Sequence, residues 1–551
     1  MDRIYSFDIF DTCLTRRCGD PKTVFEILSR RVFRDSVPSE IYRAFIVARI
    51  EAENESYSNA QTLTDIYNTF RFSHPLLVSK EELLKSEMQV EREMLSPIIA
   101  TKKIISDIRN KGHRVLFISD MYLPGEFLAS VLLEYGIMKE GDSIYVSCEQ
   151  KSTKTDGSLF QIVRNKEKLN YNTWHHYGDN KHSDFDVPRK LGIHANHITY
   201  QYSPYQEIMH HLPALSFQYG MILAGLCRSI LLEEPSHPHK DIVIDLIAPL
   251  FASFVYRVLK NAKERGINAL YFCARDAYPL YRIAKTMSTL FPDLTIEYLY
   301  ISRKSLYEGD SKNKIGYFTQ IGLATHNGKN AIVDMRSSGR TLNVLNNLLR
   351  EYGFNSVSGY FLEISSTSIS ERKEQDYYAD IDDMYINNMN SALRRLPSNW
   401  YMYELFFPLN TQRRTIGYQC KDGLYQPILS EVDEKEYRLN NVQEWVGWRN
   451  YALDSFTEWF IRLGLHKHAD SIFEQYAIPQ LAQFFSFPEK RYLKALSELY
   501  GMNSKEEYLP YIDNSSLRLP INIIRHRTIW KRGTIFYTLP KWLTKLLYRH
   551  R

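Results

Sequence analysis

Short apolar runs alternate with longer stretches over the first 200 residues of the chain. The first run leads into Asp8, and the others are RVLFIS, SIYVS, TWHHYGD and ANHITY, at 114–119, 143–147, 173–179 and 195–200. Each run is short enough for a buried strand and is followed by a turn or a helical pattern. This repetition predicts a parallel sheet with helices on both faces. Chemistry in such sheets gathers at the carboxyl ends of the strands.

A helical region separates the first of these strands from the rest. Val24, Leu28 and Val32 recur at helical spacing, and EIYRAFIVARIEAE also follows a helical pattern. We expect a helical cap over about residues 17–97, inserted over the edge of the sheet.

A second alternating region follows a connecting segment at about 204–240. Its elements are an amphipathic helix at 245–266, apolar strands near 268–277, 295–303 and 356–365, and a strand, loop and helix at 330–353. Helices are expected from about residue 385, where Trp, Tyr and Phe are frequent. Because 551 residues exceed one core, we predict an α/β domain at 1–205 and a second at 206–551 with helical additions.

Composition narrows the class of protein. Apolar residues at 44% and charged residues at 24% are typical of a globular chain, and a net charge of +5 argues against a general nucleic-acid binder. The six cysteines form no CxxC pair, so neither a disulfide framework nor a zinc site is indicated. No signal peptide and no membrane span is expected, which predicts a cytoplasmic protein.

The last 27 residues, 525–551, interleave basic residues with aromatic and aliphatic ones. Such a helix suits an anionic membrane surface or a partner protein. An ordinary C-terminal helix packed on its own domain has the same pattern. The 39 tyrosines allow two interpretations, because tyrosine lines sugar-binding clefts and also fills protein cores.

Several polar residues follow the strands of the first domain. Asp8 follows the first strand, Ser119 ends the second, Lys154 lies in KSTKTDGSLF, and Asp179 and Asp184 lie in YGDNKHSD. Phosphoryl transfer through an aspartate needs this set: a carboxylate that attacks phosphorus, hard oxygen ligands for Mg²⁺, and a cation and hydroxyl for the phosphoryl oxygens.

The segments FDIFDT, FISD, KTDGSLF and GDNKHSD together resemble the haloacid dehalogenase (HAD) superfamily of phosphatases, over roughly residues 1–205. The resemblance implies a Rossmann-like sheet, Mg²⁺ as cofactor and Asp8 as the nucleophile. It also implies that Asp8, Asp179 and Asp184 hold the metal. Phosphoryl oxygens would be bound with the help of Thr12, Ser119, Asp120 and Lys154.

One position departs from the family pattern. Its phosphatases usually carry a general-acid Asp two residues after the nucleophile, and here that residue is Phe10. Members that break carbon–halogen bonds lack this Asp as well. Asp11 is one candidate acid, and a cap residue or water are others. Asp11 is equally readable as a turn residue that caps the following backbone.

A second group of candidate residues lies in VDMRSSGRTL, at 333–342. It stands between the apolar strand NAIV and a predicted helix. Small residues at the entry to a helix let backbone N–H groups converge on a phosphate, although many such loops are simple helix starts. Gly339 is one of these small residues, the hydroxyls come from Ser337, Ser338 and Thr341, and the charge comes from Arg340.

This loop resembles the donor-binding loop of type I phosphoribosyltransferases. There, acids that precede the cradle contact the ribose of phosphoribosyl diphosphate. Asp334 matches the second acid of the usual pair, while Val333 replaces the first. The resemblance implies a diphosphate-binding turn at Arg275 and Asp276, which also read as a local ion pair. Arg303 and Lys304 would take the leaving diphosphate.

A phosphatase fused to such a transferase resembles the dual-domain ribofuranosyltransferases of bacterial polysaccharide synthesis, including O antigen and lipopolysaccharide. The resemblance implies phosphoribosyl transfer to a glycan that is linked to a lipid carrier at the inner membrane. Removal of the 5-phosphate would follow. Two alternatives stay open: a sugar phosphatase with a non-catalytic carbohydrate-binding second half, and a phosphatase of small phosphates with a scaffolding one.

Overall fold

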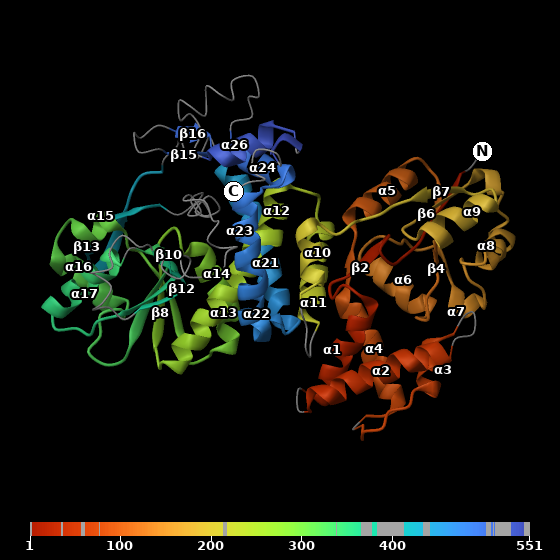
Figure 1. The fold of residues 1–551 in the computed structure, drawn as a ribbon, viewed down its shortest axis with the longest axis horizontal. Helices are drawn as coiled ribbons and strands as arrows, with labels where there is room; N and C mark the ends of the chain where they lie inside the picture. The colour runs from red at the N-terminus through yellow and green to blue at the C-terminus, as the bar shows by residue number, and fades with distance from the viewer. Residues whose placement is uncertain are drawn as a thin grey trace. The chain divides into compact units, whose positions relative to one another are not determined.

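The computed structural model describes residues 3–34, 37–56, 61–76, 78–212, 218–337, 339–364, 377–382, 413–432, 441–502, 508–510, 512, 530–540 and 542–544. The chain divides into two compact units, Met1–Ser236 and His237–Arg551. Both are built on a parallel sheet, which confirms the predicted α/β class (Figure 1).

The sheet of the first unit has the strand order β5-β4-β1-β6-β7, and all its neighbours are parallel. Its strands are β1 (Ile4–Phe7), β4 (Arg114–Ser119), β5 (Ser143–Val146), β6 (Trp174–Gly178) and β7 (His194–His197). The order reverses at β1, so β1 and β6 border the crevice in which open α/β sheets bind ligands.

Helices cover both faces of this sheet. Leu116 and Ile118 of β4 pack on one face with Leu159 and Val163, while Val115 and Phe117 are buried on the other. The helices after the cap are α5 (Ile99–Asn110), α6 (Gly125–Glu134), α7 (Ser147–Gln150), α8 (Ser158–Glu167) and α9 (Val187–Lys190).

Four helices form the cap, side by side at one end of the unit (Figure 1). They are α1 (Pro21–Phe33), α2 (Ser39–Glu55), α3 (Leu63–Thr69) and α4 (Lys80–Met94). The chain enters the cap through β2 (Leu14–Arg16) and returns through β3 (Leu95–Pro97), and these two strands pair antiparallel. The expected cap is therefore present, and its entry and exit are tied together.

The boundary between the units lies at 236–237 and not at 205–206 as we expected. Helices α10 (Pro204–His210) and α11 (Tyr219–Glu233) belong to the first unit. At Gly225 of α11 a Cβ atom would stand 2.1 Å from the backbone nitrogen of Gly19, so the helix rests directly on the loop that enters the cap. The connecting pattern at 204–240 carries no sign of this long-range contact.

The second unit has a sheet of order β12-β11-β10-β8-β9, again parallel throughout. Its strands are β8 (Ala269–Cys273), β9 (Thr295–Leu299), β10 (Asn330–Ser337), β11 (Ser358–Ile364) and β12 (Tyr377–Asp382). The order reverses between β8 and β10, so the loops after these two strands border the ligand crevice expected for such a sheet.

One face of this second sheet carries α16 (Ser311–Gln320) and α17 (Arg340–Glu351), whose apolar side chains share a core with β8 and β10. A hairpin that the sequence pattern did not predict, β13 (Thr415–Lys421) and β14 (Leu424–Leu429), packs on the same core through Tyr418. The short α15 (Arg303–Tyr307) follows β9.

Further helices complete the second unit, as the C-terminal pattern predicted. They are α12 (Pro238–Ile242), α13 (Ala248–Glu264), α14 (Tyr278–Met287), α21 (Val442–Arg462), α22 (Ala469–Ile472), α23 (Ile478–Ser486), α24 (Lys490–Ser497) and α26 (Lys531–Thr538), with a small hairpin of β15 (Tyr500–Met502) and β16 (Tyr508–Pro510). The membrane-surface hypothesis concerns the tail, of which the structure describes 530–540 and 542–544.

One continuous helix, Pro238–Glu264, is long and apolar enough to cross a membrane. Of its most apolar window, 89% is buried inside the structure, as in the core helix of a folded domain. Among the described residues no other helix meets the same test.

The cap contains a buried carboxyl group whose ionisation opposes folding. Burial raises the pKa of Glu26 to about 7 from 4.5, although Arg30 works against the shift. The folded state therefore holds this proton more tightly than the unfolded chain, and the stability that the proton confers is lost as pH rises from 4.5 through 7. We predict that Glu26→Gln stabilises the first unit by about 3 kcal/mol at pH 8. Hydrogen exchange of the α1 amides measures this, and equal protection of both proteins at pH 8 would contradict it.

Candidate active site

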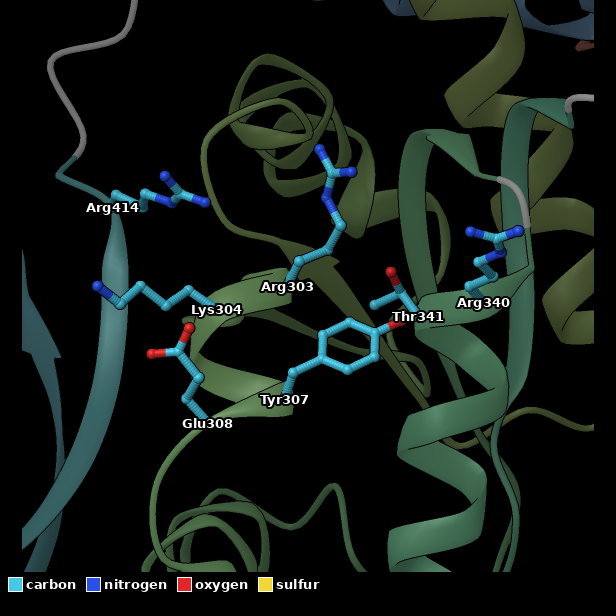
Figure 2. A pocket seen from close by; sticks show the side chains of 7 residues that line it. All are labelled: Arg303, Lys304, Tyr307, Glu308, Arg340, Thr341 and Arg414. Carbon is cyan, nitrogen blue, oxygen red and sulfur yellow. The ribbon is translucent and has the colours of Figure 1, made fainter.

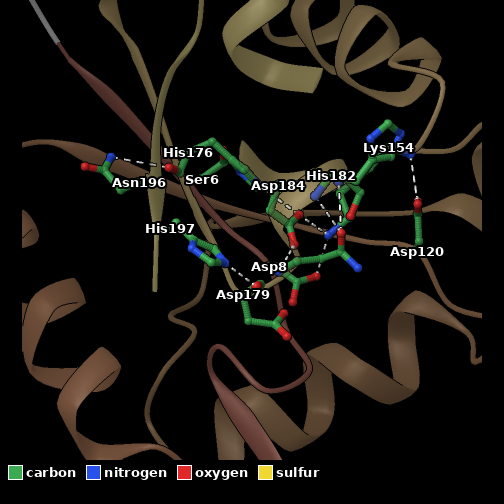
Figure 3. Close-up of polar contacts among 12 residues, drawn as sticks. Ser6, Asp8, Asp120, Lys154, His176, Asp179, His182, Asp184, Asn196 and His197 are labelled. Carbon is green, nitrogen blue, oxygen red and sulfur yellow. Dashed lines mark hydrogen bonds and ion pairs between the residues drawn. The ribbon is translucent and has the colours of Figure 1, made fainter. Parts of the chain in front are cut away.

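A buried lysine joins two carboxylates at the carboxyl edge of the first sheet. The Lys154 ammonium donates to Asp8 Oδ1 at 2.6 Å and to Asp184 Oδ1 at 2.5 Å (Figure 3). The exposed fractions of these three residues are 2%, 6% and 1%. The structure thus brings together residues that lie up to 176 positions apart in the sequence.

Each of these residues is placed by a strand end. Asp8 directly follows β1, and Asp179 directly follows β6. Asp184 lies in the helical turn Lys181–Asp186 and folds back onto Gly178, the last residue of β6. A Cβ atom on Gly178 would lie 2.4 Å from Asp184 Cγ, so glycine is needed for this approach. Lys154 precedes α8 on the neighbouring loop.

Burial and charge determine the protonation of this cluster. Burial, together with the Asp184 and Asp179 carboxylates, raises the pKa of Asp8 although Lys154 opposes the shift. Burial also acts to lower the pKa of Lys154, but Asp8 and Asp184 outweigh it and raise that pKa. For Asp184, burial is outweighed by Lys154 and His176, which hold its pKa below the usual range. The ammonium and the Asp184 carboxylate are therefore a buried ion pair.

Asp184 is also fixed from behind by a chain of hydrogen bonds. Its Oδ1 is 3.1 Å from His176 Nε2, and His176 Nδ1 is 2.7 Å from Ser6 Oγ, which in turn accepts from Trp174 Nε1 at 2.8 Å. Burial lowers the pKa of His176, which favours the neutral imidazole. The sequence analysis missed His176, because a strand histidine in a core gives no local signal.

The carboxylates of Asp8, Asp179 and Asp184 fit a divalent cation. One oxygen from each lies within 4.8 Å of the other two. Burial, Asp11 and Asp184 raise the pKa of Asp179 to about 6, so the three acids destabilise one another as anions. Carboxylate oxygens are the ligands that Mg²⁺ prefers, and a divalent charge would relieve this repulsion.

The remaining candidates of the first unit lie around the same point. Ser119 ends β4 and is 1% exposed, and Thr12 is fully buried. Among the described residues Thr12 Oγ1 has no hydrogen-bond partner. Asp120 accepts the backbone N–H of Lys154 at 2.9 Å and 3.0 Å. Asp120 therefore positions the lysine.

Asp11 has a clear structural engagement. Its Oδ1 accepts from Arg228 of α11 at 2.7 Å and from Thr15 Oγ1 at 3.2 Å. Arg228 also donates to the Tyr200 carbonyl, at 3.1 Å and 3.0 Å. The backbone of Asp11 has φ 53°, a left-handed conformation that a side chain disfavours. In these contacts Asp11 acts as an acceptor that anchors the loop through the side chains of Arg228 and Thr15.

Phe10 stands at the position of the general-acid Asp of HAD phosphatases. Its ring lies against Arg16, the last residue of β2, through which the chain enters the cap. The Arg16 guanidinium lies 4.3 Å from the centre of its ring. Arg16 is held by a two-point ion pair to Glu91 of α4, with distances of 2.9 Å and 3.0 Å. The nucleophile loop is thus linked to a cap helix through an aromatic ring and a buried arginine.

The second unit has a cationic cavity of about 500 Å³ at the residues predicted to bind the donor. Figure 2 shows its seven lining side chains: Arg303, Lys304, Tyr307, Glu308, Arg340, Thr341 and Arg414. The two predicted pairs, one from α15 and one from α17, therefore face a common space. Tyr307, Glu308 and Arg414 were not predicted.

The other predicted donor residues do not line this cavity. Arg275 has φ 71° in the turn after β8, and its N–H donates to the Tyr298 hydroxyl at 2.8 Å. Asp276 lies next to it, within the electrostatic influence of Arg275 and Arg303. Asp334 Oδ1 accepts the N–H of Met335 at 2.8 Å. This side chain belongs to β10, at the switch point of the sheet.

The predicted cradle is a tight loop at the start of α17. Ser337 Oγ accepts the N–H of Gly339 at 3.0 Å, and Gly339 has φ 83°, which suits glycine. Ser338 lies outside the described residues. The loop therefore brings the first turn of α17, with Arg340 and Thr341, to the cavity.

No protein-family model matches the chain, and no curated protein does. Among solved structures the chain is similar to a dehalogenase (16% identity, covering 37% of this chain and 87% of that one, TM-score 0.26). It is also similar to a HAD phosphatase of Thermococcus onnurineus (14%, 37% and 88%, 0.27). A magnesium-bound HAD hydrolase of Bacillus subtilis is a further match (15%, 35% and 86%, 0.27). These matches lie in the N-terminal part of the chain.

We predict that Asp179→Asn weakens Mg²⁺ binding at pH 7.5 at least tenfold, because it removes one of three anionic ligands. Isothermal titration calorimetry of the full chain with MgCl₂ measures the affinity. The matched control is Asp186→Asn, in the same turn as Asp184 but outside the acidic cluster, and it is expected to bind Mg²⁺ as the parent does. An unchanged affinity in Asp179→Asn would show that the metal does not use this cluster.

Proposed function

We propose that the first unit is a Mg²⁺-dependent phosphatase that works through an aspartyl phosphate on Asp8. The observation that carries the proposal is the set of three carboxylates within 4.8 Å of one another, joined by a buried lysine. A carbon–halogen hydrolase needs a nucleophilic carboxylate but no acidic metal cluster. The pairing of Asp179 and Asp184 with Asp8 therefore favours phosphate esters as substrates.

In the proposed reaction an oxygen of Asp8 attacks phosphorus, the bond from phosphorus to the sugar oxygen breaks, and that oxygen takes up a proton from water. Mg²⁺, which Asp8, Asp179 and Asp184 would hold, would supply positive charge that offsets the negative charge of the phosphoryl group. Lys154 holds Asp8 in place and offers its ammonium to the phosphoryl group. The hydroxyls of Ser119 and Thr12 are donors for the other oxygens. Water then cleaves the acyl phosphate and regenerates Asp8.

We propose that the second unit transfers a phosphoribosyl group from phosphoribosyl diphosphate to a glycan. Support comes from the cavity, which brings Arg303 and Lys304 of α15 to Arg340 and Thr341 of α17. Cations stabilise a departing diphosphate, and a helix N-terminus suits a phosphate monoester. In this proposal Asp334, within β10, contacts the ribose hydroxyls.

Together the two activities form a sequence. The transfer leaves a phosphate on the ribosyl product, and the first unit removes it, so that the glycan gains a plain ribosyl group. A lipid-linked glycan of surface polysaccharide synthesis is the acceptor class that we propose, with the protein in the cytoplasm at the inner membrane.

We predict that the full chain, incubated with phosphoribosyl diphosphate, Mg²⁺ and candidate glycans, yields a ribosylated glycan by mass spectrometry. Asp8→Ala is expected to accumulate the phosphoribosylated glycan, because transfer continues without dephosphorylation. Asp334→Ala is expected to give neither product. If the Asp8→Ala protein produces the same ribosyl glycan as the parent, the two-step order is wrong.

The same experiment tests the alternative in which the second half is a non-catalytic carbohydrate-binding module. In that case no donor-dependent mass increment appears in any variant. The parent then still hydrolyses sugar phosphates, and Asp8→Ala does not.

A further inference from the structure

The cavity in the second unit has an excess of positive charge. Arg303, Lys304, Arg340 and Arg414 contribute four cations, and Glu308 contributes one anion. Within the described part of the chain no hydrogen bond or ion pair engages the side chains of Arg303, Lys304 or Arg414. Three cations around one space repel one another, so the cavity is suited to a polyanionic ligand.

Arg414 reaches the cavity from a distant part of the sequence. It directly precedes β13, more than a hundred residues after α15. The hairpin is fixed there: Ser302 Oγ donates to the Thr415 carbonyl at 2.6 Å, and the Tyr418 hydroxyl donates to the Tyr300 carbonyl at 2.7 Å. Ser302 and Tyr300 lie just before Arg303, and Thr415 and Tyr418 lie on the hairpin just after Arg414. These two hydrogen bonds therefore fix the separation of the two arginines.

The neighbouring arginine has a different role. Arg413 donates to the carbonyls of Ser430 and Leu429, the latter at 3.2 Å, and so closes the open end of the hairpin. The Arg414 carbonyl accepts the N–H of Ser430 at 2.8 Å, while its side chain lines the cavity. Two adjacent residues of equal charge therefore divide into one that stabilises the hairpin and one that faces the cavity.

The cations are distributed over the walls of the cavity. In Figure 2, Arg340 and Thr341 lie on the α17 side, Lys304 and Arg414 lie on the opposite side, and Arg303 stands between them. A ligand with phosphate groups at two ends would engage both sides, and about 500 Å³ is within the range of small-ligand pockets.

We propose that Arg414 is a donor-binding residue and that, with Lys304 and Arg303, it holds the diphosphate group of a phosphorylated sugar diphosphate. The 5-phosphate of the same ligand is bound by Arg340 and Thr341. This inference rests on the proposed transferase function, and it adds the β13–β14 hairpin to the site. Guanidinium groups suit it because their planar fork binds two phosphate oxygens at once.

The test is isothermal titration calorimetry of inorganic diphosphate into the full chain, in EDTA so that no metal assists binding at Asp8. We expect Arg414→Ala to weaken binding at least tenfold relative to the parent. Lys421→Ala is the matched control: it removes the same charge from the same hairpin, but at the exposed turn end opposite Leu424 and outside the cavity lining, and it is expected to bind diphosphate as the parent does. Hydrogen exchange of the β13 and β14 amides in both variants checks that the hairpin is folded.

A second readout is the KM for phosphoribosyl diphosphate in glycan transfer, which Arg414→Ala is expected to raise at least tenfold. Equal diphosphate affinity and equal KM in Arg414→Ala and the parent would overturn the role of Arg414, while transfer by the parent would leave the proposed function in place. If the parent itself binds neither inorganic diphosphate nor phosphoribosyl diphosphate, both the inference and the transferase proposal are wrong.

Discussion

The arrangement of the first unit depends on one buried cation, the ammonium of Lys154 between the carboxylates of Asp8 and Asp184. A charge with almost no access to water is tolerated only when opposite charges and hydrogen bonds surround it. Lys154 meets this condition with two carboxylates, and its backbone N–H is held by Asp120. Removal of the lysine would leave the two buried carboxylates without the cation that they share. The same constraint holds Asp8, the proposed nucleophile, at a defined point.

The loop after Asp8, in which Asp11 has a left-handed backbone conformation, is held by elements outside the sheet. Arg228 of α11 engages Asp11 and Thr15, and Glu233 of the same helix pairs with Arg17 and accepts from Ser96 Oγ at 2.6 Å. Arg17 directly follows β2, and Ser96 lies in β3. Helix α11 therefore contacts both the loop after Asp8 and the two strands through which the chain enters and leaves the cap. These contacts explain why α11 belongs to the first unit.

Much of the first unit could be predicted from the sequence because its signals are local. Strand lengths and turn residues predict the parallel sheet. The order of the polar residues predicts a cluster at the carboxyl ends of its strands, made of Asp8, Ser119, Lys154, Asp179 and Asp184. The partners of Asp11 could not be predicted, since Arg228 is 217 positions away and lies in a segment with an ordinary helical pattern. His176 was missed for a related reason: its role depends on which strand neighbours β1.

In the second unit the sequence predicted the strands β8 to β11 and two pairs of cavity residues, but neither the edge strand β12 nor the β13–β14 hairpin. Arg414 follows a long irregular stretch, and its neighbour Arg413 has the same charge, so nothing local distinguishes the two. Only the closure of the hairpin against α15 and α16 separates a structural arginine from one that faces the cavity. The unit boundary was misplaced because helix patterns do not reveal which core a helix packs on.

The central claim is that Asp8, and not Asp11, carries the phosphoryl group. The most direct measurement is borohydride trapping: the protein is mixed with a phosphate ester and Mg²⁺, quenched, reduced and digested with trypsin. Reduction of an aspartyl phosphate converts that residue to homoserine, and the peptide from Ile4 to Arg16 contains both aspartates. Fragmentation by mass spectrometry is expected to place homoserine at position 8. Homoserine at position 11, or an unmodified peptide during active turnover, would contradict the account.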